Sequence, residues 1–240
     1  MRWAAAAVLL AAVAPGPAAA EDDDEAFDVT EIIIDKAMAG LQLAAILGPR
    51  EALGDSGRRD AGFARWPWAD GEHGYALPAD GLPGGKRLVW RLSAETGDLQ
   101  DLDSVRERIE ILVEGSWRYG VSAAVDAIGD RRLWSADLLW RPAQGPYGIV
   151  RAGGGPRVLI DDRNHESGFG LVYDVELYPV QPVIVGLRGE FGWLDDEASI
   201  RLRAQAGISL WHVEIYGGWD ALAIGLAEAS GPYAGARLRW

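Results

Sequence analysis

The sequence predicts an all-β protein, a closed antiparallel up-and-down barrel of about ten strands, with roughly 8 to 12 as the range. Three observations lead to this prediction. Apolar and polar residues alternate with a period of two through most of the chain after Lys86, the alternating segments are long, and one of their two faces carries nearly all of the charge. A helical protein would instead repeat its apolar residues every three to four positions.

The alternating segments have the length of strands that cross a membrane. Soluble strands usually contain five or six residues, whereas a membrane-spanning strand needs about 9 to 11. Most of the ten segments here are nine to thirteen residues long. The segments are 86–96, 105–115, 119–128, 132–141, 147–160, 168–178, 182–193, 198–210, 213–224 and 232–240.

The two faces of these segments differ in charge. One face is apolar, as in Leu88, Trp90 and Leu92, and the other carries charges of both signs. The charged face includes Arg91, Glu95, Arg108, Glu110, Glu114, Asp126 and Asp137 in the first segments. The residues that we expect to form a charge network in the lumen are Arg151, Arg157, Asp174, Glu176, Arg188, Glu190, Arg201, Arg203, Glu214, Asp220, Arg237 and Arg239. Unpaired charges in a narrow interior are costly, so we expect arginine–carboxylate pairs.

Two architectures produce this pattern, and they are inside-out versions of each other. A soluble barrel or sandwich packs the apolar face inward, whereas an outer-membrane barrel turns it toward lipid. Tryptophans near the ends of the apolar stripes favour the membrane barrel, because they form an aromatic girdle at the two headgroup levels. The predicted girdle residues are Trp134, Trp140, Trp193, Trp219 and Trp240.

The turns between the segments predict the orientation of the barrel. If Trp240 ends in the periplasm, the two-residue hairpin Trp211–His212 and the link at 141–146 lie there too. The turns at 194–197 and 226–230 then lie outside.

The part of the chain before the barrel divides into two segments. Residues 1–20 have the pattern of a secretory signal peptide. They contain Arg2, an apolar run from Ala4 to Ala14 and three alanines ending at Ala20. Residues 21–85 predict an irregular or partly helical segment in the periplasm or in the lumen, and residues 86–240 form the barrel.

Several short motifs support this assignment by resemblance. They are "GDLQDLDSVRERI", "DDRNHESGFGLVYDVELYPVQPVIVGLRGEFGWL", "GGWDALAIG", "GPYAGARLRW" and, upstream, "FARWPWADGEHGY". Together they resemble an uncharacterised group of bacterial outer-membrane β-barrel proteins, small barrels of the OmpA-like and porin-like kind, over about residues 62–240. The resemblance implies an outer-membrane location and a last strand, ending at Trp240, that the barrel-assembly machinery reads. This chain ends in Arg-Trp where many of that group end in Trp-Phe, and the group carries no assigned activity.

Composition narrows the possible partners and cofactors. The net charge of −13, from 36 acidic and 23 basic residues, argues against a nucleic-acid partner, which would require a basic face. The chain has no cysteine, so neither a disulfide framework nor a zinc site of thiolates is possible. We expect outer-membrane lipids and lipopolysaccharide as partners, with no cofactor and no metal.

The crowded charged face predicts what the barrel does. The interior of a barrel of 8 to 10 strands is just wide enough for side chains to fill it. We therefore expect a largely plugged lumen, a structural or surface-exposed role, and no enzymatic activity. A narrow channel for small solutes is one alternative. A lipid-directed hydrolase is another, using His165 in an outer loop with Asp161, Asp162, Glu166 and Ser167, although a His and a Ser two residues apart rarely meet as base and nucleophile.

Overall fold

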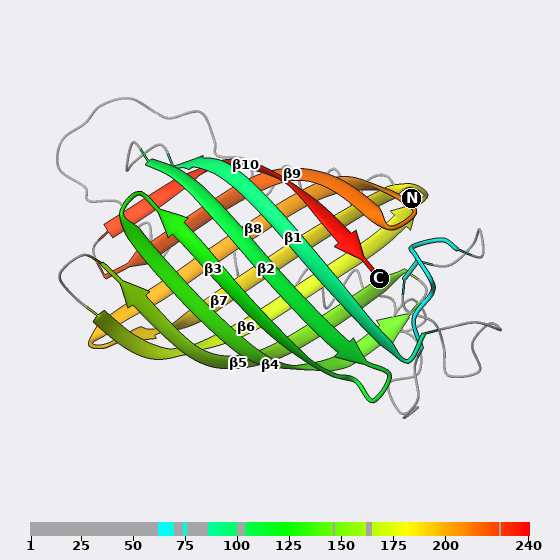
Figure 1. Cartoon of the computed structure of the whole chain (residues 1–240), viewed down its shortest axis with the longest axis horizontal. Coiled ribbons are helices and arrows are strands. Elements are labelled where there is room, and N and C mark those ends of the chain that lie inside the picture. The colour runs from blue at the N-terminus through cyan, green and yellow to red at the C-terminus, as the bar shows by residue number, and fades with distance from the viewer. Residues whose placement is uncertain are drawn as a thin grey trace, which may run out of the picture.

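The computed structural model describes residues 62–69, 74–75, 86–99, 104–145, 147–161, 165–225 and 227–240. Within these ranges the chain forms the strands β1 (Leu88–Leu99), β2 (Ser104–Gly115), β3 (Tyr119–Ile128), β4 (Arg131–Gly145), β5 (Gly148–Ile160), β6 (His165–Val180), β7 (Val183–Leu194), β8 (Glu197–Leu210), β9 (Val213–Ile224) and β10 (Ala227–Arg239). Each strand pairs with the next in antiparallel fashion, and β1 pairs with β10 to close the barrel (Figure 1). The predicted closed antiparallel up-and-down barrel of about ten strands is confirmed. No helix in the described ranges is long and apolar enough to cross a membrane.

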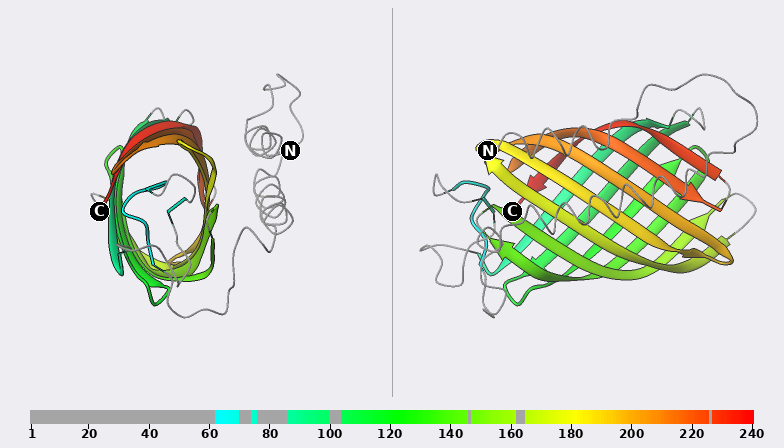
Figure 2. Two further views of the ribbon diagram at one scale, coloured as in Figure 1. Left: turned by 90° about the vertical axis from the view of Figure 1, so that its right-hand side faces the viewer. Right: turned by 180° about the vertical axis from the view of Figure 1, so that it is seen from behind.

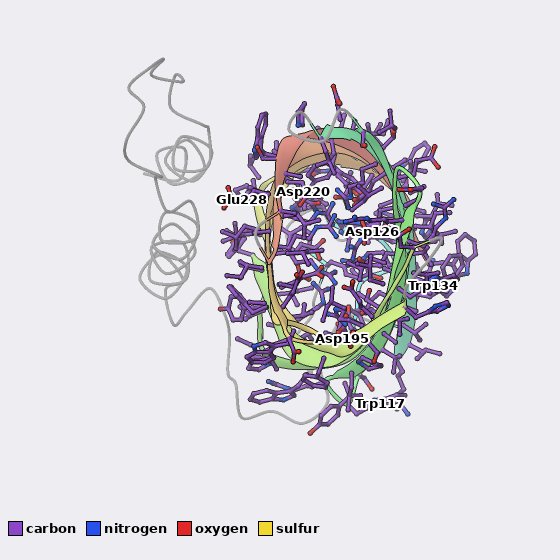
Figure 3. All side chains as sticks on the ribbon, turned by 90° about the vertical axis from the view of Figure 1, so that its left-hand side faces the viewer. Trp117, Asp126, Trp134, Asp195, Asp220 and Glu228 are labelled. Carbon is purple, nitrogen blue, oxygen red and sulfur yellow. The ribbon has the colours of Figure 1, made fainter. Side chains whose placement is uncertain are left out.

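The apolar face of the strands lies on the outside of the barrel. Along β1, Leu88, Trp90 and Leu92 are 54%, 38% and 39% exposed, whereas the intervening Val89 and Arg91 are buried. Because successive side chains of a strand point to opposite faces, this alternation places one stripe of each strand in the lumen. Figure 3 shows Asp126 and Asp220 pointing into the barrel while Trp134 points away from it.

Short turns join the strands at both ends of the barrel. We call the end that holds Trp240 the C-terminal end, and the other the opposite end. The hairpin Trp211–His212 lies at the C-terminal end between paired Leu210 and Val213, and Trp211 has a φ of 55°. The turn at Asp195 lies at the opposite end, where Leu194 pairs with Glu197.

Several strands extend into segments that the sequence predicts as loops, and β4 and β10 are two of them. Strand β4 continues through the link at 141–146 as far as Gly145, with a bulge between Trp140 and Ala143. Strand β10 begins at Ala227, so 227–230 belong to the wall and not to an outer turn. Each strand contains a proline, Pro142 in β4 and Pro232 in β10, and proline fits in a strand at a bulge or where its missing N–H is not needed.

Glycines on the inner face allow the strands to approach closely. A Cβ atom placed on Gly155 of β5 would lie 1.9 Å from the carbonyl oxygen of Ala136 on β4. A Cβ atom on Gly231 of β10 would lie 1.7 Å from the carbonyl oxygen of Asp98. Glycine in a strand often marks a sharp bend or a close backbone approach, and here it permits the curvature that closes the wall.

The tryptophans of the predicted girdle do not all lie at the rims. Trp193 and Trp240 end their strands, with exposed fractions of 58% each, and Trp134 lies near the opposite end of β4. Trp219 is a correction: it lies in the middle of β9, paired with Ala204 and Pro232. Trp219 is the last large apolar residue on the outer face of this segment, but the strand continues with Ala221 and Ala223 to Ile224, so Trp219 is not at its end. The C-terminal end also exposes Trp90, Trp117 and Trp211, which the predicted girdle omits.

Candidate functional site

The lumen is lined by an unusual number of buried charges. Among the described residues, eleven arginines and nine carboxylates are buried, and Asp174 adds a tenth, half-buried carboxylate. They come from all ten strands, because each strand turns one residue in two toward the axis. The lumen arginines and carboxylates are Arg91, Glu95, Arg106, Arg108, Glu110, Glu114, Asp126, Asp137, Arg141, Arg151, Arg157, Asp174, Glu176, Arg188, Glu190, Arg201, Arg203, Glu214, Asp220, Arg237 and Arg239.

Toward the opposite end, two aspartates from facing walls share two arginines. Arg201 Nη2 lies 3.0 Å from Asp126 Oδ1 and 2.7 Å from Asp220 Oδ2. Arg106 donates from Nε to Asp126 at 2.9 Å and also pairs closely with Asp220. Arg106 reaches Glu95 as well, at 3.3 Å. The fork of an arginine suits such bridging, since its five N–H groups point in fixed directions to several acceptors.

Glu110 is the hub at mid-height of the lumen. It pairs with Arg91 at 3.2 Å, with Arg108 at 2.8 Å and with Arg188 at 3.0 Å. Three guanidinium groups therefore surround one carboxylate. Arg108 also contacts Asp126, at 2.6 Å, and therefore connects Glu110 to the ion pairs of Asp126 and Asp220.

Glu176 is the corresponding hub toward the C-terminal end. It lies 3.1 Å from Arg151 and 3.4 Å from Arg91, and it pairs closely with Arg239. Arg237 approaches to 3.9 Å. The arginines come from β1, β5 and β10, so this carboxylate on β6 connects walls that are not neighbours in the sheet.

Two further glutamates, Glu114 and Glu214, complete the part of the network toward the C-terminal end. Glu114 accepts from Arg141 at 3.1 Å and from Arg151 at 2.9 Å. Glu214 lies 2.7 Å from Arg239 and 3.0 Å from Arg237. Each carboxylate again has at least two guanidinium partners.

All twenty-one groups belong to one continuous network of ion pairs within 4.0 Å. Arg108 connects Asp126 to Glu110, and Arg91 connects Glu110 to Glu176, so the ion pairs run from the opposite end toward the C-terminal end. The structure places all twelve residues of the predicted lumen network in it. Arg106 and Arg141 are the two members that the sequence analysis missed. Arg106 shares the parity of Arg108, and Arg141 continues the inward stripe of β4, so the alternation carried a signal for both.

Aromatic residues close the C-terminal end of the lumen. Phe63, Trp68 and Tyr75 precede β1 and form one buried cluster with Val89, Ile149, Tyr178 and Ile184 of the wall. Phe63 and Lys86 form an antiparallel bridge with N–O distances of 3.0 and 2.8 Å, and Ala64 N donates to Tyr75 O at 2.9 Å. Viewed along the barrel, this segment lies inside the ring of strands (Figure 2, left, cyan). We call it the aromatic closure.

The aromatic closure rests on the charge network. The Arg141 guanidinium lies 4.3 Å from the ring centre of Phe63, and that of Arg239 lies 5.0 Å from the ring centre of Tyr75. Such cation–π contacts are stronger where water is excluded. Burial also raises the pKa of the Tyr75 phenol, so this group stays neutral beside the network.

Apolar residues occupy the lumen near the opposite end. Leu133, Leu159 and Leu194 form a buried cluster, and Ile224 packs against it. The charge network therefore lies between an apolar layer at one end and an aromatic layer at the other. Two cavities of about 20 Å³ each remain within the lumen, and each has room for about one water molecule.

The described residues of the loop in the hydrolase alternative do not come together as a catalytic group. His165 is exposed at the start of β6, and Asp161 pairs with Arg131 at 3.6 Å. The backbone N–H of Ser167 donates to Asp195 Oδ1 at 3.1 Å. Asp162 lies outside the described residues. No group of three His, Asp or Glu side chains in the described part of the chain could hold a metal ion.

Comparison with known proteins finds similar solved structures, two of which are porins. No family model matches the chain, and no curated protein matches it. A NanC porin is 8% identical over 61% of this chain and 98% of its own, with a TM-score of 0.37. A KdgM porin is 9% identical over 62% of this chain and 98% of its own, also with a TM-score of 0.37. Overlaps this low add no argument about the activity of this chain, and the barrel described above rests on its own strand pairing.

Proposed function

We propose that this chain is an outer-membrane β-barrel protein with a filled lumen and a structural or surface-exposed role, without enzymatic activity. One observation carries the proposal. The residues that meet the surroundings along the wall are mainly apolar, whereas twenty-one charged groups lie inside it. A soluble barrel would place these two sets the other way round.

The height of the wall supports a membrane location. The twelve residues of β1 extend for about 40 Å at roughly 3.3 Å per residue. A tilt of about 45° reduces this length to about 28 Å along the barrel axis, close to the apolar band of about 25 Å in outer-membrane barrels. Exposed tryptophans at both ends, such as Trp193 and Trp240, suit the two lipid–water interfaces.

The proposed partners are lipids and the proteins that insert the barrel. Leu210, Val213 and Ile215 belong to the exposed apolar stripes that would meet acyl chains, and the outer rim would meet lipopolysaccharide. The barrel-assembly machinery would bind the last strand, which ends beside Trp240. The signal peptide proposed for residues 1–20 would direct export.

Heat-modifiable migration tests the location. We expect the protein in the outer-membrane fraction, and we expect the unheated sample to migrate differently from the boiled sample on an SDS gel. Recovery in the soluble periplasmic fraction, with no difference between the two samples, would exclude the membrane barrel.

Conductance across a planar bilayer separates the filled barrel from the alternative of a narrow channel for small solutes. We expect no resolved current steps, because the charge network, the leucine layer and the aromatic closure lie in series along the axis. Steps that scale with the number of inserted barrels would establish the channel instead.

A further inference from the structure

We propose that the lumen binds one monatomic anion of the halide class, such as chloride, in a cavity between β1, β7, β8 and β10. The cavity has a volume of about 20 Å³ and lies in the charge network. Four arginines line it: Arg91, Arg188, Arg203 and Arg237. This inference goes beyond the proposed function and does not depend on the membrane location.

The four arginines have N–H groups left over from the ion pairs. Arg91 Nε, Arg188 Nη2, Arg203 Nε and Arg237 Nε are all buried and have no hydrogen-bond acceptor among the described residues. The closest carboxylates to Arg188 Nη2 and Arg203 Nε among the ion pairs are each 3.9 Å away, beyond hydrogen-bonding distance. Each of the four side chains is more than nine-tenths buried. Leaving buried donors unsatisfied is costly, so four such donors on arginines that line one cavity point to an acceptor there.

The charge balance favours an anion over a neutral acceptor. Three carboxylates, Glu95, Glu110 and Asp174, line the same cavity against its four arginines. The whole lumen likewise holds eleven guanidinium groups and ten carboxylates among the described residues. Among the described residues the lumen therefore holds one more positive than negative charge, and an uncompensated buried charge is strongly unfavourable.

The carboxylates at the cavity already have hydrogen-bond and ion-pair partners. Glu95 pairs with Arg203 and accepts from the Tyr216 hydroxyl at 2.8 Å. Glu110 is shared by three arginines, and Asp174 lies 2.8 Å from Arg151. None of these carboxylates accepts from the four remaining N–H groups.

The size of the cavity restricts the ligand to a single atom. Sulfate, phosphate and carboxylate groups each require several heavy atoms and exceed a space that holds about one water molecule. A water molecule fits, but it accepts about two hydrogen bonds and brings no charge. A halide accepts from four N–H groups at once and neutralises the surplus.

Diffraction from crystals of the full-length protein grown with sodium bromide tests the site directly. In data measured at the bromine absorption edge, we expect an anomalous difference peak between the side chains of Arg91, Arg203 and Arg237. A water molecule at that position without anomalous signal overturns the proposal. So does bromide that is found only on the outer surface.

Unfolding in detergent gives an independent measurement. At equal ionic strength, we expect a higher urea midpoint in sodium chloride than in sodium gluconate, whose anion is too large for the cavity. Arg237→Lys keeps the positive charge that faces Glu214 but removes the Nε donor, so the chloride-dependent shift should fall to nearly zero.

The matched control is Arg141→Lys. Arg141 is also buried and has an unpartnered Nε, but it does not line this cavity. This variant should keep the full chloride-dependent shift. Equal shifts in both variants and the wild type would overturn the proposal, and if Arg237→Lys does not fold, the bromide diffraction of the wild type still decides.

Discussion

At the scale of single residues, Glu176 neutralises two arginines that closure of the barrel brings together. The pairing of β1 with β10 sets Arg91 directly opposite Arg239 on the inner face. Like charges in directly opposed positions repel each other. Glu176 lies on β6 and contacts both arginines. One carboxylate from a third strand therefore neutralises the closing seam.

Replacing Glu176 by Gln should destabilise the barrel strongly. The change leaves Arg91, Arg151 and Arg239 without a shared carboxylate, and breaking a buried ion pair by removing one partner costs about 3–5 kcal/mol. The urea midpoint of the detergent-solubilised protein measures the effect. Glu107→Gln is the control, since Glu107 is exposed on the outer face. Equal midpoints for the two variants would contradict the role of Glu176.

The sequence shows which residues are charged and inward, but not which ones meet. Alternation alone assigns Glu95 and Arg203 to the lumen, yet they pair across 108 positions of sequence. That contact depends on how far the strands are sheared and on the cross-section of the barrel, neither of which follows from parity. Arg106 and Arg141 were missed for a different reason: each lies at or next to an end of its predicted segment, where the alternation is easiest to overlook.

At the scale of elements, the strand period was more informative than the strand ends. The period of two assigns the inner and outer faces of β9, whose predicted and observed bounds agree. The ends fail where proline interrupts the pattern, at Pro142 in β4 and Pro232 in β10. There the neighbouring strand continues to pair, so tertiary context overrides a local signal that normally marks a loop.

A methyl group at Gly155 should disturb the pairing of β4 with β5. The Cβ atom of Gly155→Ala would lie 1.9 Å from the carbonyl oxygen of Ala136, so the backbones must separate. We expect a loss of at least about 1–3 kcal/mol, the usual range for overpacking, measured as a lower urea midpoint. In the control Gly217→Ala the closest heavy atom would be 3.4 Å away. A midpoint for Gly155→Ala as high as that of the control would show that the wall is more adaptable than this contact implies.

The aromatic closure and the charge network should block the lumen independently. The double variant with Phe63→Ala and Trp68→Ala removes two rings from the buried cluster at the C-terminal end. We expect it to remain heat-modifiable and to give no resolved conductance, because the ion pairs above the closure are untouched. Trp117→Ala, at an exposed turn, is the control for general effects of losing an aromatic residue. Current steps seen only in the double variant would show that the aromatic closure is the sole barrier.

At the scale of the whole molecule, the proposed orientation in the membrane predicts which end of the barrel is accessible from outside the cell. The chain has no cysteine, so single introduced cysteines give an unambiguous signal. We expect Asp196→Cys, in the turn after β7, to react with an impermeant maleimide on intact cells. Trp117→Cys, at the C-terminal end, should react only after the outer membrane is permeabilised. The reverse pattern would invert the proposed orientation.

The alternation of apolar and polar residues predicts both the apolar outer face of the wall and the set of charged residues inside it. The choice between a soluble and an inside-out barrel depended on where tryptophans lie along the strands, and Trp219 shows that this signal is approximate. The sequence predicts two possible locations for residues 21–85, the periplasm or the lumen, and Phe63 and Tyr75 lie in the C-terminal mouth of the lumen. Which rings enter the mouth does not follow from a Gly- and Pro-rich segment, because that depends on the shape of the opening.

The span of the ion pairs also sets an order of events during folding. Arg201 meets Asp126 across 75 positions, and Arg203 meets Glu95 across 108, so these contacts exist only once the first and last strands have joined. Until then the charged side chains must stay hydrated. The final step of folding therefore expels water from the axis at the moment of closure, and a barrel arrested before that step would still be wet inside.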